Sequence, residues 1–412
     1  MNPFQLTPEK ETDSFMNWQQ IYPAPYDKRT ADPYTRVRII LMNGTEFEAV
    51  KHSHAFHRHE MNNDLRRELA LMRRQEQQQQ KKIACLKPMD ETVLEHTIGY
   101  EQLAVDLTAI LAQRVTCPHV KSALDFALLE DFDHLYRYAD LMEMEHGEYA
   151  EKLVGDYTEI MPGRPTISEH RYPFDALCQP GKNDAALFDK LAVNIITAAE
   201  QQTMNYYMNV CNLYTSDLGR RLYQEIGMIE EQHVTQYGSL LDPNMTWLEG
   251  QLMHEYTEAY LYYSCMQDET DRHVREMWER FFLMEVNHLH KAAELLATYE
   301  KKEWQQVIPE GEFPAPLRFA PNIAYVRDAL NMADFTAEKE IFKPVGMMPR
   351  DAEFFAYQQT VNGSGDKVPS HQVIREIIRK NGKDYRAETA PNPIPALQNR
   401  GVDNTTLGRA YQ

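Results

Sequence analysis

Apolar side chains recur every three to four residues along most of the chain between about residues 90 and 300. This is the period of helices that bury one face. Short turns rich in proline, glycine, aspartate and asparagine separate most of these stretches. Six helices are predicted, at residues 91–114, 119–153, 184–214, 217–241, 245–268 and 271–300. We therefore expect an all-α fold.

The two ends of the chain follow this pattern less clearly. Residues 1–88 are predicted to form a polar N-terminal arm with one helical segment, at 65–82. Beyond residue 305 proline returns and the helical period is mostly lost, which predicts an extended tail that wraps over its own bundle or a neighbouring subunit. The expected organisation is thus an arm at 1–88, a helical domain at 89–304 and a C-terminal tail at 305–412.

Acidic and histidine residues interrupt the apolar stripes of the predicted helices. In the last helix, for example, the stripe is continuous except for Glu285 and His288. Nine such residues occur: Glu101, Asp131, His134, Glu200, Glu230, His233, Glu255, Glu285 and His288. Burying a carboxylate is costly unless it is paired or bound to a metal, so these positions need a common explanation.

The spacing of these residues favours metal binding. A carboxylate three residues before a histidine shares one helix face with it, although a single such pair arises easily by chance. Three pairs have a further carboxylate thirty residues upstream: Glu255 before Glu285, Glu200 before Glu230, and Glu101 before Asp131. A helix rises about 1.5 Å per residue, so this offset returns the chain to the same height in an antiparallel helix pair.

A lone glutamate followed by Glu-x-x-His, repeated over four helices, resembles the ligand scheme of the ferritin-like di-iron carboxylate proteins. That superfamily includes rubrerythrins, ribonucleotide reductase small subunits, bacterial multicomponent monooxygenases and manganese catalases. The resemblance covers residues 90–300 and matches no single family. It implies a ferritin-like helical bundle, here with an extra helical hairpin. It also implies two bound iron ions, or alternatively manganese or a mixed iron and manganese pair.

Three half-sites are present where the resemblance implies two. The proline-containing segment 154–183 is long enough for the crossover of a ferritin-like bundle, which favours the first two half-sites: Glu101, Asp131 and His134 with Glu200, Glu230 and His233. The alternative joins the last two, since Asp131 departs from the usual glutamate and Glu130 could serve with His134 instead. Under the first choice Glu255, Glu285 and His288 are a relic of duplication or half of a second site, completed by another subunit.

Charge and cysteine content narrow the class of protein. With 43 basic and 62 acidic residues the net charge is −19, which argues against nucleic-acid and anionic-membrane partners. The five cysteines are scattered without a C-x-x-C pair, so a rubredoxin-type site is not expected. The chain starts without a signal-peptide pattern and contains no apolar run of membrane-spanning length. A cytoplasmic protein is expected.

The resemblance implies redox chemistry with dioxygen or peroxide. An oxidase or oxygenase is the first hypothesis, and an external electron donor would supply electrons because the chain lacks a rubredoxin-type site. A peroxide-scavenging protein similar to rubrerythrin or manganese catalase is an alternative, and a non-catalytic metal-binding or storage protein is another. A homo-oligomer, namely a dimer, is also expected.

Overall fold

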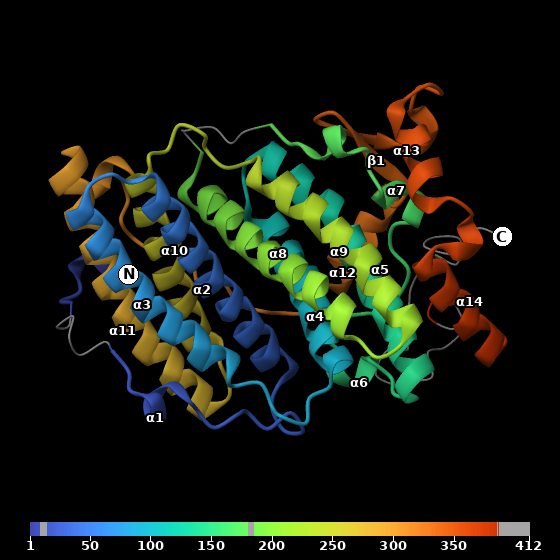
Figure 1. Cartoon of the computed structure of the whole chain (residues 1–412), viewed down its shortest axis with the longest axis horizontal. Helices are drawn as coiled ribbons and strands as arrows, with labels where there is room; N and C mark the ends of the chain where they lie inside the picture. Colours follow the sequence, from blue (N-terminus) through green and yellow to red (C-terminus); the bar gives the residue numbers. More distant parts are fainter. Residues whose placement is uncertain (9–14, 180–184, 385, 387–412) are drawn as a thin grey trace. The chain divides into compact units, whose positions relative to one another are not determined.

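The computed structural model describes residues 1–8, 15–179, 185–384 and 386. The described chain is predominantly helical, with a small two-stranded antiparallel sheet (Figure 1). The expectation of a helical protein is therefore confirmed. Among the described helices, none has the length and apolar character that a membrane span requires.

The chain divides into two compact units, each assembled from separate stretches of sequence. Unit 1 comprises Met1–Glu91, Asn183–Ala199 and Asp242–Phe319, and unit 2 comprises Thr92–Lys182, Glu200–Leu241 and Ala320–Gln412. The domain expected at 89–304 is thus shared between both units. Hydrophobic periodicity shows which face of a helix is buried, but it does not show which other helix covers that face.

Unit 1 is built around four long helices that run side by side in Figure 1. These are α2 (Pro33–His59), α3 (Asn63–Ala84), α10 (Trp247–Asp268) and α11 (Arg272–Leu295). The expected polar arm therefore holds two core helices, preceded by the short α1 (Trp18–Ile21). The hydrophobic pattern does not identify α2 as a core helix, because this helix also buries charged side chains. Arg38, for example, forms an ion pair with Glu269 at 2.9 Å inside the unit. In the glutamine-rich α3, Leu65, Leu69 and Met72 supply the buried stripe.

Unit 2 contains α4 (Val93–Arg114), α5 (Pro118–His146), α9 (Asp217–Gly238) and the part of α8 (Leu187–Leu213) from Glu200 onward. Side-chain caps fix two of the helix starts: Thr92 forms a capping box with Glu95, and Ser216 accepts a hydrogen bond from the backbone of α9. Helix α5 ends earlier than the predicted residue 153. It stops at Gly147, which takes a positive φ of 69°.

The segment between α5 and α8 packs into unit 2 as far as it is described. It contains α6 (Glu151–Val154), α7 (Thr166–Glu169) and a 3-10 turn at Pro173–Ala176. Gly163 lies so close to α5 that a Cβ at this position would be 2.4 Å from the carbonyl oxygen of Leu129. Its backbone N–H donates to Asp133 at 2.8 Å. This close approach brings the following residues, including Arg164 and Arg171, into the interior of the unit.

The predicted tail contains regular structure. It holds α12 (Ile323–Ala329), the antiparallel strands β1 (Phe335–Glu338) and β2 (Ile341–Pro344), α13 (Glu353–Asn362) and α14 (Pro369–Asn381). Helix α14 packs against α5 and α9 and buries Ile374 and Ile377. The expected extended end of the tail, residues 387–412, lies outside the described residues.

Candidate metal centres

Six of the predicted ligands meet in the core of unit 2, and they come from four helices. Helix α4 supplies Glu101, α5 supplies Asp131 and His134, α8 supplies Glu200, and α9 supplies Glu230 and His233. All six are at most 1% exposed. Their potential ligand atoms fall into two groups, within each of which all atoms lie within 4.8 Å of one another: Asp131, Glu200, Glu230 and His233, and Glu101, His134 and Glu230. Glu230 belongs to both groups, an arrangement that suits two neighbouring metal ions.

The contacts inside this cluster join carboxylates to imidazoles. Glu230 Oε1 lies 3.0 Å from His134 Nδ1, and Glu230 Oε2 lies 3.2 Å from His233 Nδ1. His233 Nδ1 also lies 3.2 Å from Asp131 Oδ1 and 3.7 Å from Glu200 Oε2. Among the described residues, both oxygens of Glu200 and one of Glu101 lack a hydrogen-bond partner. Buried oxygens without a donor are costly, so a cation fits this donor set.

The pKa values of the cluster reflect an excess of buried negative charge. Burial, together with the charge of Glu200, raises the pKa of Asp131 to about 7. Burial also raises the pKa of Glu230 well above its usual value. Burial would lower the pKa of His233, but the charge of Asp131 and the surrounding hydrogen bonds raise it well above the usual value. In contrast, burial and the charge of Arg137 lower the pKa of His134. A divalent cation would relieve this excess and displace the protons that the carboxylates retain.

Glu130, which one alternative above paired with His134, contacts the other histidine of the cluster, His233. Its Oε2 atom lies 2.6 Å from His233 Nε2. Arg164 and Arg171 lie 3.5 and 3.4 Å from the same carboxylate. Burial would raise the pKa of Glu130, but the charges of Arg171 and His233 lower it below the usual value. An ionised carboxylate on Nε2 leaves Nδ1 of His233 facing the cluster, which is how outer residues orient metal-binding histidines.

The other three predicted residues, Glu255, Glu285 and His288, lie in unit 1. They form a second cluster with residues that sequence analysis did not select. Two groups of potential ligand atoms occur, again within 4.8 Å in each group: Glu76, Glu255 and His288, and Glu255, Glu258 and Glu285. Helix α3 of the same chain thus contributes Glu76 to this half-site.

The N-terminal half of this second cluster carries a signal that sequence analysis missed. Glu46 on α2 precedes Glu76 on α3 by thirty residues, the same offset as in the other three helix pairs. Three residues after Glu76 stands Gln79 rather than histidine, so a search for Glu-x-x-His excluded the pair. The thirty-residue offset between acidic residues, applied without the requirement for histidine, includes this pair.

The two clusters orient one histidine in the same way. His288 Nε2 lies 2.9 Å from Gln75 Oε1 in unit 1, just as His233 Nε2 contacts Glu130 in unit 2. Gln75 precedes Glu76 in the chain and Glu130 precedes Asp131, so the supporting residue occupies the same position relative to the ligand. The difference is charge, because unit 1 uses a neutral amide where unit 2 uses a carboxylate.

A buried tyrosine also contacts the first glutamate in both clusters. The Tyr207 hydroxyl donates to Glu101 in unit 2, and the Tyr262 hydroxyl donates to Glu46 in unit 1. Tyr207 follows Glu200 by seven residues, and Tyr262 follows Glu255 by the same interval. Two four-helix arrangements of one chain therefore share a common plan.

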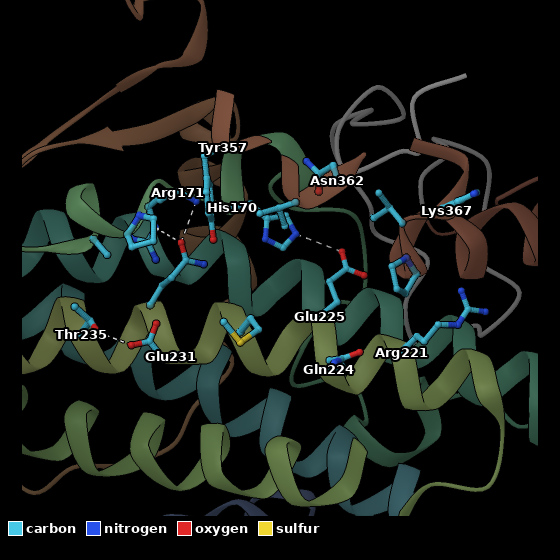
Figure 2. Close-up of a pocket in the computed structure, with 17 residues that line it drawn as sticks. His170, Arg171, Arg221, Gln224, Glu225, Glu231, Thr235, Tyr357, Asn362 and Lys367 are labelled. Atoms are coloured by element: carbon cyan, nitrogen blue, oxygen red, sulfur yellow. Dashed lines mark hydrogen bonds and ion pairs between the residues drawn. The ribbon is translucent and has the colours of Figure 1, made fainter. Parts of the chain in front are cut away.

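Unit 2 also contains a pocket of about 520 Å³ beside α9 (Figure 2). None of the six clustered residues of this unit lines it. Figure 2 shows His170 directed toward Glu225, with 3.6 Å between His170 Nε2 and Glu225 Oε1. Arg171 forms part of the wall, and its guanidinium reaches Glu130. The pocket is therefore linked to His233 through Arg171 and Glu130.

Comparison of the chain with protein-family models, curated proteins and solved structures finds no match. The functional conclusion therefore depends on the chemistry and geometry of the two clusters.

Proposed function

We propose that unit 2 holds a dinuclear iron centre and that the protein is an oxidoreductase acting with dioxygen or peroxide. Manganese, or a mixed iron and manganese pair, is the alternative metal content. The observation that carries this proposal is the pair of overlapping ligand groups in unit 2, which share Glu230 and contain buried carboxylate oxygens without hydrogen-bond donors.

The donor set supports this choice of metal. Carboxylates are hard oxygen ligands, and one imidazole in each group adds a nitrogen donor, a combination that suits iron and manganese. When bound, such a metal pair supplies redox chemistry with oxygen or peroxide. The protein residues keep the site dry, hold it between four helices and fix the direction of His233 through Glu130.

Tyr207 places a protonated hydroxyl group next to the cluster. Burial, and then the charge of Glu101, raises the pKa of Tyr207 well above its usual value, so the phenol keeps its proton and donates it in a hydrogen bond to Glu101. The five cysteines contain no C-x-x-C pair of the kind that a rubredoxin-type site uses. We therefore propose that electrons come from an external donor or from an organic substrate.

Metal loading followed by oxygen tests the proposal. The metal-free protein is loaded with Fe²⁺ without oxygen, its iron content is measured, and its absorption spectrum is recorded before and after oxygen is added. We expect about two ions in unit 2, and a spectral change on oxidation that His233→Ala abolishes. Glu276→Gln, which changes an exposed carboxylate of α11, serves as the control. Equal iron content and spectra in wild type and His233→Ala would disprove the assignment.

The same preparation separates the alternatives. An oxidase or oxygenase consumes oxygen repeatedly when a chemical reductant is present. A peroxide scavenger consumes hydrogen peroxide faster than oxygen under these conditions. A storage protein oxidises its bound iron once and then stops.

A further inference from the structure

We propose that the cluster in unit 1 is a second metal site, which binds hard divalent cations of the Mn²⁺ type and uses Glu258 as a ligand. Its candidate ligands come from α3, α10 and α11, all of which lie in unit 1. The proposal therefore stands independently of the centre proposed in unit 2.

Two carboxylates of this cluster are buried without the partners that a purely structural role requires. Among the described residues, both oxygens of Glu258 and both of Glu76 lack a hydrogen-bond partner, and the two residues are at most 1% exposed. Glu255 and Glu285 lie 3.7 and 3.3 Å from His288. Each also accepts a hydrogen bond from a neutral glutamine amide, Gln251 at 2.5 Å and Gln79 at 2.6 Å. Several buried acids facing one imidazole leave negative charge that a cation would neutralise.

A buried acid elsewhere in unit 1 shows the contrast. Glu269 accepts hydrogen bonds from two nitrogen atoms of Arg38, at 2.9 and 3.2 Å, and from the hydroxyl of Thr35 at 2.6 Å. The fold thus supplies donors where a carboxylate only stabilises the structure. Glu258 lies on α10, the helix that ends just before Glu269, and receives none from the described residues.

The cluster contains one subsite made only of carboxylates. Glu255, Glu258 and Glu285 each offer an oxygen within 4.8 Å of the others, and Glu255 also belongs to the group with Glu76 and His288. The two groups thus share Glu255, as the two groups of unit 2 share Glu230. The amide of Gln79 donates to Glu285 Oε1 at 2.6 Å, which holds this carboxylate in place without taking its other oxygen.

The differences between the clusters select the type of cation. Unit 1 has Gln79 where unit 2 has His134, and it has Glu258 at the position that Thr203 occupies after Glu200. A nitrogen donor is lost and a carboxylate is gained. Oxygen-rich sites favour manganese, magnesium and calcium. Mg²⁺ gives up its water shell reluctantly, so a dry cage of carboxylates suits Mn²⁺ better.

Manganese titration of a full-length chain without the unit 2 histidines tests this site. His134→Ala and His233→Ala are combined, folding is checked by circular dichroism, and free Mn²⁺ is followed by its electron paramagnetic resonance signal. We expect this protein to bind Mn²⁺ with no displacement by equimolar Mg²⁺. Adding Glu258→Gln should weaken Mn²⁺ binding about tenfold or more, whereas adding Glu276→Gln should leave it unchanged.

Two results would overturn the proposal. One is absence of Mn²⁺ binding in the folded double variant, and the other is equal affinity of the Glu258→Gln and Glu276→Gln proteins. If the double variant does not fold, Glu258→Gln alone is compared with wild type, and an unchanged Mn²⁺ binding curve then refutes the site. Iron loading is also measured in the Glu258→Gln protein, in which the ligands of unit 2 are unchanged. Failure of the centre in unit 2 is thereby distinguished from failure of the site in unit 1.

Discussion

Replacing Glu200 by methionine should change the stability of the protein in opposite directions with and without metal. Glu200 is 1% exposed, and its two oxygens lack a hydrogen-bond partner among the described residues. A buried polar group without a partner costs roughly 1–3 kcal/mol, so Glu200→Met should raise the free energy of unfolding of the metal-free protein by about that amount. Methionine is close to glutamate in size and flexible, so it should fill the same space.

With metal present the sign should reverse. A cation at a concentration of 100 times its dissociation constant stabilises the wild-type protein by about 2.7 kcal/mol. The Glu200→Met protein lacks one ligand and should lose most of this stabilisation. In thermal unfolding, 1 kcal/mol corresponds to a shift of about 2–4 °C for a domain of this size class.

Glu169→Met provides a matched control in the same unit. Glu169 is also fully buried, but each of its oxygens accepts a hydrogen bond from Arg137 at 2.9 Å. Removing one partner of a buried ion pair costs about 3–5 kcal/mol, and the lower end applies because Asp133 still contacts Arg137. This loss should be the same with chelator and with metal.

Thermal unfolding is followed by circular dichroism, first with a chelator and then with Fe²⁺ or Mn²⁺. This measures the stability change caused by each of the two substitutions without and with metal. The expected pattern is a stabilised Glu200→Met protein in chelator and a destabilised one in metal. If Glu200→Met destabilises the chelated protein as much as Glu169→Met does, Glu200 is a structural acid. The ligand assignment would then be wrong.

Three further predictions concern the support of the centre, a buried thiol and the C-terminal helix. Glu130→Gln should weaken metal binding in unit 2 about 10–100-fold, because it loosens the hold on His233; chelator competition measures this, and unchanged affinity would contradict the role. Burial raises the pKa of Cys178 to about 12. Iodoacetamide should therefore modify this thiol slowly in the folded protein at pH 8, faster as the pH rises, and readily after unfolding. Equal rates of modification in the folded and unfolded protein, measured by mass spectrometry, would contradict this prediction. Ile377→Ala on α14 should cost about 2–5 kcal/mol and speed proteolysis of the C-terminal segment, while Ile341→Ala, at a side chain 65% exposed, should not.

The sequence alone predicted the carboxylate–histidine pairs of three of the four helix pairs. The offset of thirty residues between Glu200 and Glu230 places both at one height of a helical hairpin, because turn length and helical rise are local properties of the chain. The three-residue step to His233 is equally local, since it depends only on the helical period. Glu101 likewise shares a group of ligand atoms with His134, which stands three residues after Asp131.

Only the tertiary structure decided which hairpin faces which. The hairpin of Glu46 and Glu76 joins that of Glu255 and Glu285, although about 180 residues separate them in the chain. A helical stripe specifies that a face is buried, and many apolar surfaces of similar width can cover it. Arg171 contacts Glu130 from an irregular segment that has no hydrophobic period. Such contacts depend on the path of the whole backbone, and so they appear only once the helices are packed.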